Sequence, residues 1–569
     1  MTISITGIAA SRGIAIGPAW IYRPVEIIIE RLENAEPKKE WDRLQTAIKK
    51  ANSQLEELER KALQRVGEKE AEIFGAHRMF LEDPELIGSI KLSIDHKLNA
   101  EAAVQEGIEG FAKTLMALES EYFQARADDV RDVGRRVVAC LLGVNLGWTD
   151  LPQEAVVIFA DDLNPSDTMH FETDRILGLC TRRGGPTSHT AILSRSLGVP
   201  AVVSTPFDID SIHTGQMVVL NGISGEVILK PSKEQILEAS KEREQIADLR
   251  AARLKKAGQP AMTMDGHKVK VMANIGSLAD AHQAVEYGAE GIGLLRTEFL
   301  YMNREQLPDL GEQVDIYQAL FDVMGTQPIV VRTLDIGGDK QVSYLGLKGE
   351  PNPFLGWRAI RMIGERPEVL RDQFQAILRA GVGRDLRIML PLVSSVDEVI
   401  ATKEIINEAM QVLNMQNIPF AEQVQFGIMV EVPSAALLIE HFAEYVDFFS
   451  IGTNDLAQYT LAVDRTNERV AALASPFHPA VIQLIARTIE QAHVNGKWVG
   501  LCGEMAGDPL ATSLLLGLGL DEFSMAPFAV PKIKETIRGL DKQACEKIAA
   551  NVLLLSRTSD VISHLQDVV

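Results

Sequence analysis

Apolar residues recur at helical spacing between residues 36 and 147. One stretch alternates steps of four and three residues at Leu44, Ile48, Ala51, Leu55, Leu58 and Ala62. The same period runs from Val104 to Tyr122 and from Val130 to Leu141. Positions with this spacing lie on one side of a helix and pack against neighbouring helices. We predict an antiparallel bundle of about four helices over residues 23–147, in which Gly134 is an unfavourable helix residue.

Strand-like segments flank this bundle. Residues 5–22 read as short strands broken by glycine, and residues 155–160 form one buried apolar run. Residues 212–229 predict a hairpin with turns at Asn221-Gly222 and Ser224-Gly225. Because residues 1–22 and 148–230 share this character, we predict one α/β domain into which the bundle is inserted. Residues 231–260 form a highly charged stretch that predicts a linker helix.

The remaining residues, 261–569, are enough for a (β/α)₈ barrel. Helical patterns alternate there with β-rich apolar runs, as expected of parallel strands buried on both faces. The runs cover 269–274, 291–297, 328–335, 386–391, 427–431, 448–452, 499–504 and 523–526. The predicted fold class is therefore a multidomain α/β protein with a carboxyl-terminal barrel of the TIM type.

Polar residues gather where the barrel runs end, which is the active face of such barrels. Glu431 and Asp455 follow the fifth and sixth runs, so both carboxylates could reach one ion. Oxygen ligands that leave room for water and substrate suit Mg²⁺. The alternative interpretation is that either carboxylate caps a helix.

Four arginines belong to the same predicted face: Arg296, Arg332, Arg358 and Arg465. The planar guanidinium matches the oxygens of phosphate or carboxylate, and several of them in an acidic chain indicate an anionic substrate. Cys502 ends the seventh run. It either fills the core or donates a proton to the substrate.

A glycine-rich loop leads into His189 within residues 181–200, TRRGGPTSHTAILSRSLGVP. Thr187 or Ser188 is a plausible N-cap, so His189 lies in the first turn of a helix. The helix dipole disfavours the imidazolium there by roughly 0.3–1 kcal/mol, and a neutral ring nitrogen is a nucleophile. The free N–H groups of that turn favour an anion such as a phosphoryl group. The alternative is a helix-start histidine without a role.

Composition narrows the class of protein. The 569 residues are 46% hydrophobic and 24% charged, with a net charge of −21. This charge argues against non-specific binding of nucleic acid or of an anionic membrane surface. The four cysteines form no CxxC pair, which fits a cytoplasmic protein without disulfides. We expect no signal peptide and no membrane insertion.

Several motifs together resemble Enzyme I of the bacterial phosphoenolpyruvate:sugar phosphotransferase system, over essentially the whole chain. They include GGPTSHTAILSRSLGVPAVV, GIGLLRTEFLYM, VVRTLDIGGDK, GIMVEVPSA, FFSIGTNDLAQYTLAVDR and LCGEMAGDP. The resemblance implies a swivelling phosphohistidine domain, phosphorylated at His189 Nε2, and a barrel that binds phosphoenolpyruvate. It further implies phosphate-binding Arg296 and Arg332, substrate contacts from Arg358, Asn454 and Arg465, Mg²⁺ ligands Glu431 and Asp455, proton donor Cys502, and Thr168 and Arg195 beside the phosphohistidine.

The same family implies a helical domain that docks the phosphocarrier protein HPr, and a homodimer formed through the barrel. A phosphoenolpyruvate synthase or pyruvate phosphate dikinase relative is the nearest alternative, but no glycine-rich ATP loop is visible. A nitrogen-related paralogue would carry an additional sensory domain. A non-catalytic docking protein would have no need of the intact His189, Glu431, Asp455 and Cys502.

Overall fold

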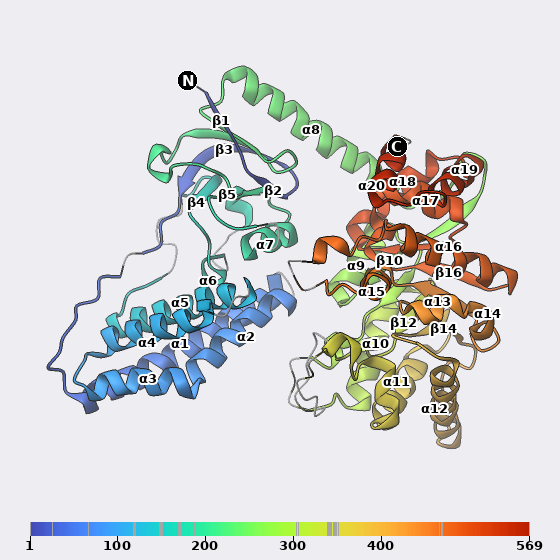
Figure 1. Ribbon diagram of the computed structural model, residues 1–569, viewed down its shortest axis with the longest axis horizontal. Helices are drawn as coiled ribbons and strands as arrows, with labels where there is room; N and C mark the ends of the chain where they lie inside the picture. The colour runs from blue at the N-terminus through green and yellow to red at the C-terminus, as the bar shows by residue number, and fades with distance from the viewer. Residues whose placement is uncertain are drawn as a thin grey trace. The chain divides into compact units, whose positions relative to one another are not determined.

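The computed structural model (Figure 1) describes residues 2–25, 27–65, 68–117, 121–146, 152–168, 173–185, 188–302, 304, 306–337, 344, 350, 352–465, 467 and 470–567. The chain divides into two compact units, Met1–Asp248 and Leu249–Val569. Each unit has a hydrophobic core of its own.

The first unit contains an eight-stranded sheet in the order β1-β8-β7-β3-β4-β5-β6-β2. Four central strands, β3 to β6, run parallel, and the others join them antiparallel. Their bounds are β1 (Ile3–Thr6), β2 (Ile8–Ser11), β3 (Ile14–Ile21), β4 (Val156–Ala160), β5 (Ile176–Thr181), β6 (Ala201–Val203), β7 (Met217–Asn221) and β8 (Glu226–Leu229). Short helices α6 (Pro165–Thr168) and α7 (His189–Leu197) connect β4 to β5 and β5 to β6. The two segments predicted to share an α/β fold therefore contribute to one sheet.

A helical bundle is inserted between β3 and β4 (Figure 1). It consists of α1 (Pro37–Arg65), α2 (Glu68–Glu82), α3 (Pro84–Asp95), α4 (Ala100–Ala117) and α5 (Glu121–Leu142). The predicted apolar stripe of α1 is buried at Leu44, Ala51, Leu55, Leu58 and Ala62, and Ile48 is partly buried. Gly134 lies where α5 approaches α4, since a Cβ there would stand 2.5 Å from Ile108 Cγ1.

The charged stretch predicted as a linker forms the helix α8 (Lys233–Lys255). The division between the two compact units falls inside it, at residues 248 and 249. Within the first unit, Ala239 packs with Ile14 and Val219. Within the second, Arg253 pairs with Glu535 at 2.6 Å. Helix α8 therefore contacts residues of the first unit through Ala239 and a residue of the second unit through Arg253.

The second unit is a closed barrel of eight parallel strands. They are β10 (Lys268–Ile275), β11 (Ile292–Leu295), β12 (Ile329–Arg332), β13 (Leu386–Leu390), β14 (Gln425–Val430), β15 (Phe448–Ile451), β16 (Trp498–Leu501) and β17 (Glu522–Met525). Each strand pairs with the next, and β17 pairs with β10 to close the ring. The short β9 (Ala261–Met262) joins β10 antiparallel. All eight predicted runs are confirmed as barrel strands.

Helices follow the barrel strands in sequence. They are α9 (Leu278–Glu286), α10 (Leu310–Met324), α11 (Pro367–Ala380), α12 (Val396–Met415), α13 (Pro433–Leu437), α14 (Ile439–Phe442), α15 (Thr453–Leu461), α16 (Pro479–Val494), α17 (Pro509–Leu518), α18 (Val530–Arg538), α19 (Lys542–Val552) and α20 (Thr558–Gln566). In the described part of the chain, no helix is both long and apolar enough to cross a membrane.

The strand ends opposite the polar face hold a buried aromatic and ionic cluster. Phe448 and Trp498 stack with ring centroids 4.5 Å apart. The guanidinium of Arg387 covers the Trp498 ring at 4.9 Å and lies 3.5 Å from Glu522. Burial raises the pKa of Glu522 to about 7. This cluster lies at the amino ends of β13, β15, β16 and β17, opposite the predicted active face.

Candidate active site

A chain of buried ion pairs begins at the carboxyl end of β12. Arg332 Nη2 donates to Glu298 Oε1 at 2.6 Å, and Arg332 Nη1 lies 3.1 Å from Asp335. Asp335, only 1% exposed, also accepts two hydrogen bonds from Arg358, at 2.8 and 2.9 Å. Two of the predicted arginines are therefore held by one carboxylate that the sequence analysis did not single out.

The chain continues from Arg358 to the residues after β15. Arg358 Nη2 donates to Asp455 Oδ2 at 2.9 Å, and Arg465 Nη1 lies 3.2 Å from Asp455 Oδ1. Arg358 Nη1 also donates to the hydroxyl of Tyr459 at 3.2 Å. The structure thus brings Arg332, Arg358, Asp455 and Arg465 together.

The arginines stay charged in this environment. Burial alone would lower the pKa of Arg332, but Glu298, Asp335 and Glu431 raise it above its usual value. Burial also acts to lower the pKa of Arg358, but nearby carboxylates, chiefly Asp335, raise it above its usual value. Buried guanidinium groups with paired oxygens are suited to binding phosphate or carboxylate.

Glu431 and Asp455 fit the requirements of a divalent cation. Both are buried, at 1% and 5% exposure. Burial, followed by the nearby charges of Asp455 and Asp335, raises the pKa of Glu431. Asp455 Oδ1 lies 3.2 Å from Arg465 Nη1 and accepts no well-aligned hydrogen bond from the described residues. A cation between these carboxylates would relieve their repulsion.

The protein itself supplies few further donors to such a cation. Over the described ranges, no group of three or more His, Cys, Asp or Glu side chains has metal-site geometry. The backbone N–H of Leu392 donates to Glu431 Oε1 and fixes that carboxylate. Two protein carboxylates with the other positions left for substrate and water would suit Mg²⁺, which retains water readily.

The other predicted barrel residues lie at neighbouring strand ends. Cys502 follows β16, is 5% exposed, and burial raises the pKa of its thiol to about 11. It is therefore a protonated thiol near pH 7, as a proton donor requires. Asn454 exchanges two hydrogen bonds with Glu504, at 3.2 and 3.3 Å. Arg296 is exposed, and no carboxylate of the described residues pairs with it.

His189 opens α7 in the first unit. Ser188 is the N-cap residue and accepts from Ala191 N at 3.4 Å, while Thr187 lies outside the described residues. Gly198 ends the helix with φ of 66°, a conformation that glycine adopts without strain. The His189 side chain is exposed at the surface. Its pKa is lowered, chiefly by desolvation from the surrounding protein, so the neutral nucleophilic form is favoured.

A buried histidine cluster, which the sequence analysis missed, lies within electrostatic range of His189. Asp129 raises the pKa of His189, and His77 lowers it. His77 is fully buried, with Nε2 3.3 Å from Asp129 and Nδ1 3.8 Å from Asp132. Asp132 accepts a hydrogen bond from Ser166 of α6 at 2.5 Å. The sequence signal was slight, because only the spacing of Asp129 and Asp132 on one helix face pointed to it.

The two predicted supporting residues, Thr168 and Arg195, lie on α6 and α7. Arg195 is exposed, and its Nη1 donates to the carbonyl of Ala10 at 3.1 Å. This contact ties α7 to β2. Thr168 closes α6, and its side chain lies outside the described residues.

Asp335 was missed although it ends a predicted strand run. It lies three residues after Arg332 and 23 residues before Arg358 in sequence. The sequence shows that Asp335 is near Arg332. Its contact with Arg358 depends on a loop whose course hydrophobic periodicity does not predict.

Comparison with known proteins covers all parts of the chain. Residues 6–126 match the family described as PEP-utilising enzyme, N-terminal, residues 152–225 the mobile domain, and residues 250–542 the PEP-binding domain. The phosphoenolpyruvate-protein phosphotransferase of Priestia megaterium is 45% identical, covering 100% of this chain and 99% of the relative. Those of Geobacillus stearothermophilus and Bacillus subtilis are 44% and 42% identical over 99% of this chain, covering 98% and 99% of the relatives. The resemblance found in the sequence is confirmed: the chain belongs to the phosphoenolpyruvate-protein phosphotransferase family, Enzyme I of the phosphotransferase system.

Proposed function

We propose that this protein transfers the phosphoryl group of phosphoenolpyruvate to His189 Nε2 and then to HPr, and releases pyruvate. This is the first step of sugar uptake by the phosphotransferase system. The buried arginine and carboxylate chain at the barrel end carries the proposal. Guanidinium groups ordered by Asp335 and Asp455 match the oxygens of a small phosphorylated carboxylate.

Different residues bind the substrate, accept the phosphoryl group and donate the proton. Arg296, Arg332, Arg358 and Arg465 bind the phosphate and carboxylate oxygens, with Asn454 beside them. The lone pair of His189 Nε2 forms the new N–P bond while the bond from phosphorus to the enol oxygen breaks. The enolate left behind takes a proton at carbon from the Cys502 thiol, which later regains one from solvent.

Glu431 and Asp455 would hold Mg²⁺. The ion supplies charge neutralisation for the transferring phosphoryl group and the enolate oxygen. Glu431 is fixed by Leu392 N, and Asp455 by Arg358 and Arg465, so neither ligand needs a large movement to bind it.

The partners follow from the family and from surface features. HPr would dock on the helical bundle, and the net charge of −21 favours a basic partner. A homodimer would form through the barrel unit, where Leu437 and Leu554 are exposed apolar side chains. The protein would act in the cytoplasm. An ATP-dependent synthase or dikinase is not favoured, since full-length relatives carry the phosphotransferase name.

Incubation with labelled phosphoenolpyruvate and Mg²⁺, without ATP, tests the proposal. We expect acid-labile label on His189 and release of pyruvate, measured by mass spectrometry and a coupled assay. His189→Ala should accept no label. Normal labelling of that variant would reject the nucleophile assignment.

Asp455→Ala separates the metal site from the nucleophile. It should lose Mg²⁺-dependent turnover of phosphoenolpyruvate by about a thousandfold or more. It should still accept a phosphoryl group on His189 from phosphorylated HPr, because that step does not use the barrel. Normal turnover of phosphoenolpyruvate by Asp455→Ala would remove Asp455 from the metal site.

A further inference from the structure

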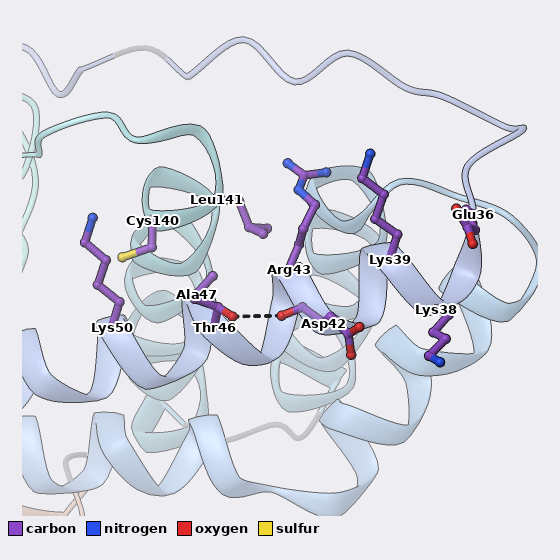
Figure 2. A pocket seen from close by; sticks show the side chains of 10 residues that line it. All are labelled: Glu36, Lys38, Lys39, Asp42, Arg43, Thr46, Ala47, Lys50, Cys140 and Leu141. Atoms are coloured by element: carbon purple, nitrogen blue, oxygen red, sulfur yellow. Dashed lines mark hydrogen bonds between the residues drawn. The ribbon is translucent and has the colours of Figure 1, made fainter.

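A groove with several basic side chains runs between α1 and α5, among residues to which the proposed chemistry assigns no role. One part is a cavity of about 610 Å³, whose lining includes Lys39, Arg43, Lys50 and Cys140 (Figure 2). A second cavity of about 280 Å³ shares Lys50 with it and adds Gln54, Lys61 and Arg136. Positions 50, 54, 57 and 61 follow one side of α1, so they line the groove continuously.

Arg136 of α5 is the unusual member of this groove. It is only 6% exposed, and its Nη1 donates to the neutral side chain of Gln54 at 3.1 Å. Its Nε is buried without a hydrogen-bond partner. Within the described part of the chain, no carboxylate lies within ion-pair distance of it. Burying a cation without a counter-charge lowers the free energy of unfolding. A buried cation is therefore usually paired with an anion.

Two other arginines of the bundle, unlike Arg136, have carboxylate partners. Arg43 on α1 pairs with Glu40 at 2.6 Å and also with Glu101. Arg131, one and a half turns earlier on α5, pairs with Glu109 and Asp128 at 3.0 and 2.9 Å. Both are more exposed than Arg136 and yet have carboxylate partners.

The charge around Arg136 is positive and open to solvent. Lys50 and Lys61 line the same cavity, and Glu57 is the single carboxylate among its lining residues, paired with Lys61 at 2.8 Å. Three cations and one anion leave an excess of two positive charges in a chain of net charge −21. A dianion would balance it. A cavity of about 280 Å³ holds a small molecule and not a folded partner.

We propose that this groove is a binding site for a small phosphate-bearing anion, with the guanidinium of Arg136 as its buried anchor and Lys50 at its mouth. Arginine forms paired hydrogen bonds to phosphate oxygens, and Nε and the second terminal nitrogen of Arg136 are free for them. Neither His189 nor any barrel residue lines this cavity. The test of the site is therefore independent of the proposed phosphotransfer chemistry.

Cys140 provides a local reporter of occupancy. It is a half-buried thiol whose Sγ lies 3.7 Å from Gln54 Oε1, and the other three cysteines are buried. Burial raises its pKa, and the charges of Lys50 and Arg136 oppose that increase. A bound phosphate would cancel those charges and raise the pKa of the thiol, which slows its alkylation.

The experiment measures alkylation of Cys140 by neutral iodoacetamide in the full-length protein, by mass spectrometry, with inorganic phosphate added at constant ionic strength. We expect saturable slowing by about threefold or more, as half a pKa unit would give. Arg136→Gln should abolish this protection, and Lys50→Gln should weaken it. The matched control Arg131→Gln, on the same helix, should keep it.

Three outcomes would overturn the proposal: no slowing by phosphate, equal slowing by chloride, or full protection retained in Arg136→Gln. If Arg136→Gln does not fold, Lys50→Gln and the direct effect of phosphate on the unfolding temperature of the wild type decide instead. A saturable rise in that temperature, reduced by Lys50→Gln, supports the site. Its absence rejects the site.

Discussion

Asp335 positions two arginines and is almost fully buried. It accepts two hydrogen bonds from Arg358 and pairs with Arg332, so one side chain helps to orient both guanidinium groups. Neither arginine is fixed by packing alone, because each is surrounded by charges. The orientation of the substrate site therefore depends on this residue.

Asp335→Asn should impair both substrate use and folding. The amide can retain one hydrogen bond but loses the charge, so we expect kcat/KM for phosphoenolpyruvate to fall by about a hundredfold or more. Loss of a buried partner should also cost roughly 3–5 kcal/mol in the free energy of unfolding. Steady-state kinetics and urea unfolding measure the two effects.

The matched control is Glu312→Gln, which breaks the pair of Glu312 with Arg304 on the barrel surface, 2.7 Å in length. Exposed pairs contribute less than about 1 kcal/mol, so this variant should behave as the wild type. Unchanged kcat/KM in Asp335→Asn would show that the arginines are positioned without it.

Glu522 should make the barrel less stable as the pH rises. Its pKa is about 7 in the folded protein against 4.5 as the ordinary value. A raised carboxyl pKa contributes stability below about pH 4.5 that is lost as the pH passes through about 7. Between pH 5 and 8, the wild type should lose roughly 1–3 kcal/mol more than Glu522→Gln in urea unfolding. Equal losses would show that Glu522 titrates normally.

Single residues were predictable where a motif or a strand end marked them. Glu431, Asp455 and Cys502 were proposed from their places after barrel strands, and the structure places them there. Asp335 and His77 were missed because their importance lies in contacts with distant residues. Hydrophobic periodicity reports which face of an element is buried, and carries little information about polar partners inside it.

At the scale of elements, Gly134 permits close packing of α5 against α4. A Cβ at this position would stand 2.5 to 2.9 Å from three atoms of Ile108, which is itself buried in the bundle core. The same glycine lowers the helix propensity of α5. The sequence revealed only that cost, since the benefit depends on the neighbouring helix.

Gly134→Ala should therefore destabilise the first unit despite the better helix propensity of alanine. Overpacking costs about 1–3 kcal/mol against a propensity gain of about 1 kcal/mol. Gly110→Ala, on the exposed face of α4 with no atom within 4 Å of the new Cβ, is the control. It should gain about 0.5–1 kcal/mol. Thermal unfolding measures both, and a stabilised Gly134→Ala would contradict the packing argument.

The helical stripes and the barrel strands were predicted more successfully than the number of bundle helices. Five helices form where about four were expected. The additional boundary lies at Asp83, whose side chain caps α3 through the N–H groups of Glu85 and Leu86. An Asp-Pro pair such as Asp83-Pro84 is typical of a turn, but periodicity alone does not show that helices continue on both sides.

For the whole molecule, the two compact units have separate cores, and their division falls inside one helix. Units with separate cores usually unfold as separate cooperative transitions. We expect two transitions in scanning calorimetry. Gly134→Ala should lower only one of them, by about 2–4 °C per kcal/mol, and Glu522→Gln should affect only the other. A single transition shifted by both variants would show that the units unfold together.

Arg332, Arg358 and Arg465 are paired with carboxylates before any substrate arrives. Arg296, Arg332, Arg358 and Arg465 share this end with the carboxylates of Glu298, Asp335, Glu431 and Asp455, so the formal charges cancel. A ligand in solution therefore meets little long-range attraction and gains its affinity at contact, by taking over guanidinium groups from internal carboxylates. A simple inorganic anion that replaces one carboxylate partner leaves the other arginine–carboxylate pairs in place. The site therefore discriminates among anions by the number of these pairs that one ligand can replace.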